Sequence, residues 1–269
     1  MSATLPFVKM VGTGNDFIVL DLRRQRITQP LPVLARQLCR RARSIGADGL
    51  LAIESSRRAD LKMRIVNPDG SEASMCGNGA RCVALYAAQG QAKRRLVIQT
   101  RAGNVQAEIL SPRRVRVTLT TPSPVRIKSL TACLRRFRVY AIDTGVPHAV
   151  IFVPDIRQID VPELGPAIRH HRLFRPGGTN VDFVQALNRH TLRLRTYERG
   201  VEAETLACGT GAVAAALAAA STKLCQSPVA VYPTSGERLV IRFDPIRADW
   251  RHVSLEGEVH RVFEGVVTL

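Results

Sequence analysis

The chain has 269 residues, of which 45% are hydrophobic, enough to bury the core of one large domain or of two ordinary ones. No apolar stretch approaches the roughly 18 residues of a membrane helix and no signal-peptide pattern is present, so we expect a cytoplasmic protein without a membrane partner. The formal net charge is +17, but the basic residues form short scattered runs and only 5% of residues are aromatic, which favours solvated arginine-rich faces and no nucleic-acid partner.

Strand patterns outnumber helical patterns along the chain. Runs bounded by Gly, Pro, Asn and Asp predict strands at, among others, residues 17–20, 62–66, 95–99, 115–119, 140–142, 150–153, 229–232, 239–243 and 260–267. Helical spacing of apolar residues predicts helices at 32–43, 80–88, 162–170 and 212–224. These patterns are typical of an α+β fold, and the proline-rich stretch 120–125 predicts a linker near the midpoint.

The six cysteines are sparse, which favours reduced thiols over a disulfide framework. No CxxC pair occurs, and Cys76 and Cys82 lack the second pair or nearby histidine that a zinc site needs, so we expect no metal. Four cysteines are expected to be small hydrophobic residues: Cys39, Cys82, Cys133 and Cys225.

The most informative feature is an internal repeat. The segment CGNGARCVALYAA from Cys76 matches CGTGAVAAALAAA from Cys208 at the cysteine, both glycines and several alanines. A second pair, GTGNDF from Gly12 and GTNVDF from Gly178, precedes the cysteine of each half. We infer two related domains that face each other across a pseudo-twofold axis.

In each repeat the cysteine and glycines come directly before a helical pattern. The sulfur and the loop N–H groups should therefore lie at a helix N-terminus, which binds an α-carboxylate and favours a thiolate. Two such thiols on opposite sides of one centre can invert it, because one removes the α-proton and the other delivers a proton to the opposite face. We infer an amino-acid racemase or epimerase that uses Cys76 and Cys208. No lysine in either motif could form a Schiff base, so the chemistry needs no cofactor.

Two functions of other classes remain as alternatives. An acyl-transfer enzyme with one cysteine nucleophile and a histidine base would leave the second cysteine of the repeat unexplained. A basic binding protein on a degenerate enzyme scaffold would suit the net charge, but the intact pair of Cys76 and Cys208 argues against it.

Further motifs run along nearly the whole chain: KMVGTGNDF near the start, GADGLL at Gly46, NPDGSEASMCGNGARC at Asn67, GVPHAV at Gly145, GGTNVDFV at Gly177, YERGVEAETLACGTGA at Tyr197 and HRVFEG near the end. With these motifs the chain resembles the diaminopimelate epimerase family, whose members interconvert LL- and meso-2,6-diaminopimelate in lysine and peptidoglycan precursor synthesis. The resemblance implies a homodimer and two pseudo-symmetric α+β domains, each a curved, mainly antiparallel sheet around a central helix. We expect the domains at 1–123, joined by the C-terminal strand 258–269, and at 124–257.

The resemblance also assigns roles to individual residues. It implies that Cys76 and Cys208 are the acid and base, and that His148 and Glu198 support them. The substrate contacts that it implies are Asn15, Asn67, Gly77, Asn78, Asn180, Glu198, Arg199, Gly209 and Thr210, of which Gly77, Asn78, Gly209 and Thr210 bind the α-carboxylate through their loops.

Each of these residues also has an ordinary structural use. Glu198 and Arg199 fit an exposed ion pair, the asparagines fit turns, and His148 fits a packing or capping role. The chain departs from the family pattern at Val11, where histidine is common, at Val146, where asparagine is common, and by one extra residue in ERGVEAET. The departures leave the thiol chemistry intact and keep a racemase of another amino acid as the alternative.

Overall fold

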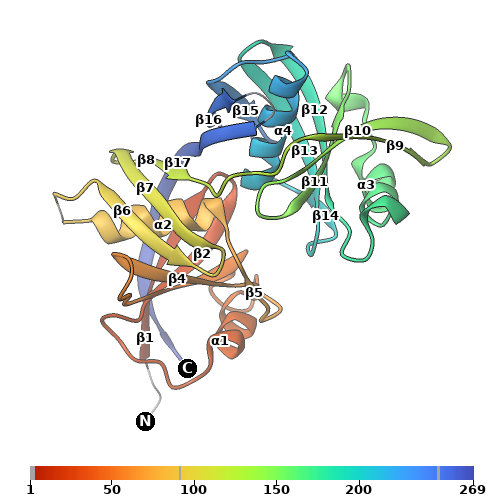
Figure 1. The fold of residues 1–269 in the computed structure, drawn as a ribbon. Coiled ribbons are helices and arrows are strands. Elements are labelled where there is room, and N and C mark those ends of the chain that lie inside the picture. The colour runs from red at the N-terminus through yellow and green to blue at the C-terminus, as the bar shows by residue number, and fades with distance from the viewer. Residues whose placement is uncertain (1–3, 91, 247–248) are drawn as a thin grey trace. The chain divides into compact units, whose positions relative to one another are not determined.

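The computed structural model describes residues 4–90, 92–246 and 249–269. The chain divides into two compact units, unit 1 from Met1–Thr118 with Gly257–Leu269 and unit 2 from Leu119–Glu256 (Figure 1). The predicted linker, 120–125, contains no helix or strand and lies at the start of unit 2.

Unit 1 is a sheet that closes on itself around one helix. Its strands pair in the order β17–β1–β2–β3–β4–β6–β7–β8, with β8 returning to β17 and the short β5 beside β4. The strands are β1 (Thr4–Gly12), β2 (Asn15–Asp21), β3 (Gly49–Glu54), β4 (Leu61–Val66), β5 (Glu72–Ala73), β6 (Arg95–Thr100), β7 (Gly103–Ser111), β8 (Arg114–Thr118) and the last part of β17 (Asp249–Thr268). The helices are α1 (Leu31–Leu38) and α2 (Gly77–Ala88).

Unit 2 is a sheet that packs around a second helix. Its strands pair in the order β9–β10–β11–β12–β13–β15–β16–β17, with β14 beside β13. The strands are β9 (Arg126–Ala132), β10 (Arg135–Asp143), β11 (Pro147–Phe152), β12 (Asn180–Asn188), β13 (Thr191–Glu198), β14 (Ala203–Thr205), β15 (Val229–Tyr232), β16 (Leu239–Ile246) and the first part of β17. The helices are α3 (Val161–Arg169), α4 (Gly209–Ser221) and the single turns η1 (Ile156–Gln158) and η2 (Arg172–Phe174).

In each unit one helix packs against each face of the sheet (Figure 1). The central helices α2 and α4 are buried nearly all round, and their many alanines let strands approach from several sides. The amphipathic helices α1 and α3 cover the outer faces, where they bury leucines, isoleucine and valine against the strands. The predicted α+β class, with a curved sheet around a central helix, is confirmed.

The two units repeat one pattern of strand pairing. In unit 1, β2 pairs parallel with β3, β3 antiparallel with β4, β4 parallel with β6, and β6 antiparallel with β7. In unit 2 the same relations join β11 to β12, β12 to β13, β13 to β15, and β15 to β16. The strands β2, β3 and β4 therefore correspond to β11, β12 and β13, and the helices α2 and α4 correspond to each other.

This correspondence corrects one predicted repeat. The segment from Gly178 enters β12, whose counterpart is β3, so it is not equivalent to the segment from Gly12, which enters β2. The true counterpart of the turn at Thr13 and Gly14 is the turn at Thr144 and Gly145, which leads into β11. The repeat that begins at Cys76 and Cys208 is confirmed, because each cysteine precedes the central helix of its unit.

The predicted helices all exist, with shifted ends. α1 stops at Leu38 and not at residue 43, and Ala42 has a left-handed backbone with φ of 60°. α2 and α4 begin three residues earlier than predicted, at Gly77 and Gly209, because the cysteine before each glycine caps the helix. Among the described residues, no helix has the length and hydropathy to span a membrane.

The buried thiol of Cys82 should make the free energy of unfolding depend on pH. It lies fully buried on α2 against Gly12, where burial raises the pKa of the thiol to about 12 from about 9. Above pH 9 the unfolded chain ionises at this residue and the folded chain does not, so folding stability falls as pH rises toward 12, by about 1.4 kcal/mol per pH unit for one group. In Cys82→Ala the alkaline decline of the unfolding free energy in urea should be shallower by about that amount.

Val83→Ala is the matched control for this prediction, because it removes a buried side chain from the same helix without removing a titratable group. It should lower the unfolding free energy by a similar amount at every pH. An alkaline decline in Cys82→Ala as steep as in the parent protein would contradict the expected role of the buried thiol.

Candidate active site

Cys76 is the N-cap residue of α2. Its backbone is extended, with φ of −146° and ψ of 115°, and its Sγ accepts a hydrogen bond from the Gly79 amide at 3.3 Å. A Cβ at Gly79 would lie 2.9 Å from Cδ2 of Leu51, so glycine allows the first turn of α2 to pack directly on β3. The half-buried sulfur therefore lies at the positive end of a helix, as the sequence predicts.

Cys208 caps α4 in the same way. Its Sγ accepts from the Gly211 amide at 3.4 Å and lies 3.4 Å from Oγ1 of Thr210. Burial, reinforced by the nearby carboxylates of Glu198 and Asp182, raises the pKa of the Cys208 thiol well above its usual range. The hydrogen bonds from Thr210 and Gly211 oppose this shift without cancelling it. Cys208 is therefore a protonated thiol at neutral pH.

Two predicted substrate-binding asparagines are joined next to α2. Arg81 donates to Oδ1 of Asn78 at 2.8 Å, Nδ2 of Asn78 donates to Oδ1 of Asn15 at 2.7 Å, and Nδ2 of Asn15 donates to Asp48 at 3.1 Å. Arg41 pairs with the other oxygen of Asp48 at 2.6 Å. An arginine donates only and an ionised carboxylate accepts only, so this chain fixes the orientation of both amides.

Arg81 is the most deeply buried charge in this part of unit 1. Its side chain is fully enclosed and also donates to Oγ1 of Thr13 at 2.7 Å and to the carbonyl of Gly77 at 3.3 Å. A buried guanidinium is tolerated when acceptors replace its lost hydration, and these oxygens accept from its Nη1 and Nη2 atoms. Arg81 thus connects the first turn of α2 to the turn between β1 and β2. These hydrogen bonds also help to fix the positions of Gly77, Asn78 and Asn15.

The other predicted residue of unit 1, Asn67, serves a turn. Its Nδ2 donates to Oγ of Ser71 at 2.9 Å, while its backbone accepts from Gly70 at 2.9 Å and donates to Ser71 at 2.8 Å. Within the described residues, no hydrogen bond joins Asn67 to Asn15 or Asn78. Asn67 stands at the end of β4, at the position that Glu198 occupies at the end of β13.

In unit 2, Asn180 connects two predicted segments. Its Nδ2 donates to the carbonyl of Pro147 at 3.0 Å, and its Oδ1 accepts from the backbone N–H of Arg199 at 2.8 Å. Glu198, the neighbour of Arg199, accepts a hydrogen bond from Thr205 at 2.9 Å. The buried amide therefore positions the backbone at the end of β13, where the charges of Glu198 and Arg199 begin.

Val146 has the place in unit 2 that Asn15 has in unit 1. Both follow a Thr-Gly pair in the turn before corresponding strands, and the carbonyl of Val146 accepts from the backbone N–H of Thr144 at 3.1 Å. A valine side chain cannot form the amide hydrogen bonds that Asn15 forms with Asn78 and Asp48. The two turns are alike in their backbones and different in the polar groups that they present.

His148 is fully buried on β11, beside Asn180 in the parallel register of β11 and β12. Its Nδ1 lies 2.7 Å from Oδ2 of Asp182, and Oδ1 of the same carboxylate accepts from Thr196 at 2.7 Å. Sequence reasoning missed Asp182 and Thr196. The available signal was a charged residue between the apolar Val181 and Phe183 in a strand, which is uncommon in a buried segment unless the charge is paired.

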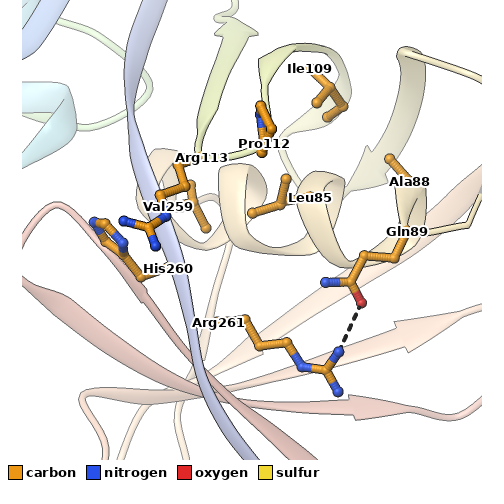
Figure 2. A pocket seen from close by; sticks show the side chains of 9 residues that line it. All are labelled: Leu85, Ala88, Gln89, Ile109, Pro112, Arg113, Val259, His260 and Arg261. Carbon is orange, nitrogen blue, oxygen red and sulfur yellow. Dashed lines mark hydrogen bonds between the residues drawn. The ribbon is translucent and has the colours of Figure 1, made fainter.

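A cavity of about 440 Å³ lies elsewhere in unit 1, between the end of α2, the β7–β8 turn and β17 (Figure 2). Gln89 accepts a hydrogen bond from Arg261 at its edge, at 3.3 Å. The lining residues are Leu85, Ala88, Gln89, Ile109, Pro112, Arg113, Val259, His260 and Arg261. None of the predicted site residues lines it, so the candidate site is defined by the two cysteine caps and not by this cavity.

Known proteins are similar to this chain along nearly its whole length. The family model described as diaminopimelate epimerase matches residues 7–125 and 140–261. The chain is 42% identical to the diaminopimelate epimerase of Aquifex aeolicus over 273 residues, 97% of each protein, and 44% identical to that of Methanothrix thermoacetophila over 278 residues, 98% of this chain and 96% of the relative. A solved hydroxyproline epimerase from Agrobacterium vitis shares the fold, with a TM-score of 0.74 and 15% identity, over 100% of this chain and 94% of that chain.

The two capping thiols should differ in reactivity. Cys208 is 6% exposed and protonated at neutral pH, whereas Cys76 is partly exposed. Because the thiolate is the reactive form, iodoacetamide at neutral pH should alkylate Cys76 at least about tenfold faster than Cys208. Peptide mass spectrometry at successive times measures both rates. Equal rates at the two cysteines would show that the environment of Cys208 does not hold it as a thiol.

Proposed function

The chain belongs to the diaminopimelate epimerase family, and we propose that it interconverts LL- and meso-2,6-diaminopimelate by proton transfer at Cα between Cys76 and Cys208. This reaction serves lysine and peptidoglycan precursor synthesis. The observation that carries the proposal is the repeated cap, in which a cysteine sulfur and the first-turn amides of a buried helix occur together in both units. The caps lie in unit 1 and unit 2, to which we assign the proposed domains 1–123 with 258–269 and 124–257.

The first amides of each helix supply the binding site for the reacting carboxylate. The first-turn N–H groups of a helix have no partner within it, and in α2 and α4 they belong to Gly77, Asn78, Gly209 and Thr210. Such donors bind an α-carboxylate and stabilise the additional negative charge when the α-proton leaves. The glycines keep the backbone open to close approach of the ligand.

The raised pKa of Cys208 supports a division of labour between the thiols. In the resting enzyme we assign Cys208 as the acid and Cys76 as the thiolate base. Cys76 takes the α-proton, the carbanion takes the proton of Cys208 on its opposite face, and the two sulfurs exchange protonation states. The reverse reaction begins from the exchanged state. All groups in this proton transfer belong to the protein or to the substrate.

The non-reacting end of diaminopimelate carries a second ammonium and a second carboxylate. Glu198 and Arg199 at the end of β13 offer the complementary charges, and Asn180 holds their backbone in place. Asn15 and Asn67 are the polar groups that we assign to the same end of the substrate from unit 1. His148 and Glu198 are assigned to support the proton transfers.

The activity assay tests the proposed reaction directly. Purified protein without pyridoxal phosphate should convert LL-diaminopimelate to the meso form and incorporate solvent deuterium at Cα. Cys76→Ala and Cys208→Ala should each lose at least about 10³-fold in kcat, because each removes one of two proton-transfer groups. Cys133→Ala, which changes an exposed thiol in the β9–β10 turn, should retain the parent rate.

Two results would contradict the proposal. One is absence of both turnover and deuterium exchange with diaminopimelate, together with exchange in another L-amino acid, which would favour the racemase of a different substrate. The other is full turnover in a variant that lacks either capping thiol, which would refute the two-base scheme.

We further propose a cytoplasmic homodimer. The reaction requires two reduced thiols, which a reducing compartment maintains. Exposed apolar side chains on β17 support pairing with a second copy: Val262, Phe263 and Val266 are 55%, 47% and 63% exposed. Sedimentation should give twice the chain mass, and Phe263→Lys with Val266→Lys should give the monomer. Leu134→Lys, at a fully exposed residue elsewhere, should leave the dimer intact. A monomeric parent protein would contradict this assignment.

A further inference from the structure

Asp182 is a carboxylate with no access to solvent. An ionised carboxylate loses several kcal/mol of hydration when buried, unless hydrogen bonds and charges replace the water. Its partners are Nδ1 of His148 and Oγ1 of Thr196, each at 2.7 Å. Among the described residues, His148 is the one basic side chain that forms an ion pair with it.

The first turn of α4 lies against the same carboxylate. A Cβ built on Gly211 would lie 2.5 Å from Oδ1 of Asp182, so the absence of a side chain at Gly211 brings the helix N-terminus and the carboxylate together. The positive end of a helix stabilises an anion at this position. Asp182 therefore packs against the first turn of the helix that Cys208 caps and also contacts His148.

The internal repeat has apolar residues where unit 2 has these polar groups. By strand register, His148, Asp182 and Thr196 correspond to Phe17, Leu51 and Ile65 of unit 1. Leu51 packs under Gly79 of α2 as Asp182 packs under Gly211 of α4. All six side chains are buried, so the same frame is filled by an apolar trio in one unit and by a hydrogen-bonded polar trio in the other.

Nε2 of His148 is the imidazole nitrogen that does not face Asp182. Within the described part of the chain, Nε2 is buried and has no hydrogen-bond partner. An ionised carboxylate at Asp182 accepts a hydrogen bond from Nδ1–H, so the neutral imidazole has its lone pair on Nε2. A buried nitrogen with an unused lone pair can accept a proton, and the resulting imidazolium would be stabilised by Asp182.

We propose that Asp182 is a positioning residue that holds His148 as the Nδ1–H tautomer, with Nε2 ready to accept a proton during the reaction, and that Thr196 fixes the carboxylate in this role. The inference rests on the proposed function for the reaction that His148 serves. The proton comes from the thiol that is to act as the base: its S–H bond breaks as the N–H bond at Nε2 forms, which leaves a thiolate, and the positive charge on the ring is balanced by the carboxylate of Asp182.

Asp182→Asn tests the role with little change of shape. The Oδ1 of the asparagine can still accept from Thr196, and its Nδ2 then donates to Nδ1 of His148, which moves the imidazole proton to Nε2. The wrong tautomer should lower kcat by roughly 10²- to 10⁴-fold, with KM for diaminopimelate changed by less than about threefold. Thr196→Val keeps the carboxylate, so it should keep the tautomer and lose less activity.

NMR of the full chain labelled with ¹⁵N-histidine reads the tautomer directly. Two-bond ¹H–¹⁵N spectra should show a protonated Nδ1 and an unprotonated Nε2 for His148 in the parent protein, and the reverse in Asp182→Asn. His148→Gln assigns the signals among the six histidines. A parent spectrum with the proton on Nε2 would overturn the proposal, and so would an Asp182→Asn variant that keeps both the parent tautomer and the parent kcat.

A combined variant separates positioning from folding. His148→Phe with Asp182→Leu and Thr196→Ile copies the apolar trio of unit 1, and it should fold with the parent circular dichroism spectrum while losing activity. Loss of folding in this variant would assign the polar trio a structural role and overturn the proposal. Because the tautomer is measured without substrate, a parent protein inactive on diaminopimelate would contradict the proposed function and leave the tautomer result to decide the role of Asp182.

Discussion

The first amides of a helix have no acceptor within the helix and need one from outside it. In both units a cysteine sulfur provides this acceptor, at 3.3 Å from the Gly79 amide and 3.4 Å from the Gly211 amide. The strands that enclose α2 and α4 depend on the small residues of these helices, and the close packing of each first turn depends on a glycine. The same packing fixes the position of each sulfur. The contacts that pack each helix are therefore the contacts that position its sulfur. A larger residue at Gly79 or Gly211 would disturb the packing and the position of the sulfur.

The polar chain beside α2 adds directional order to this frame. Its hydrogen bonds run from Arg81 through Asn78 and Asn15 to Asp48, so each amide presents its oxygen to the arginine side and its NH₂ group to the carboxylate side. Each NH₂ group keeps one further proton beyond the hydrogen bond that it donates within the chain. A substrate at these amides would therefore meet donors, which suits a carboxylate better than an ammonium group. The orientation is a property of the whole chain, since turning one amide would oppose like groups at both of its neighbours.

The sequence alone predicted the features that depend on residues close together in the chain. The Cys-Gly-x-Gly-Ala repeat predicted both helix caps, and apolar spacing predicted all four α-helices. The sequence did not predict which distant strands pair with each other. The matching letters after Gly12 and Gly178 suggested equivalence, but the register of the strands shows that they enter β2 and β12, which do not correspond. Asp182 and His148 are far apart in sequence, and only the parallel pairing of β11 with β12 brings their side chains together.

The repeated frame places a buried cation near one cysteine cap and a buried carboxylate near the other. In unit 1 the buried ion near the cap is Arg81, whose guanidinium contacts the first turn of α2, and the strand below carries Leu51. In unit 2 the residue that corresponds to Arg81 is the apolar Val213, and the strand below carries the carboxylate of Asp182. A cation favours a thiolate and a carboxylate favours a thiol. A two-base reaction needs one thiol of each kind at its start, and a strictly symmetric molecule would give both sulfurs the same protonation state. Under the proposed two-base scheme, the buried charges that break the repeat give the two caps the different protonation states that an acid and a base need.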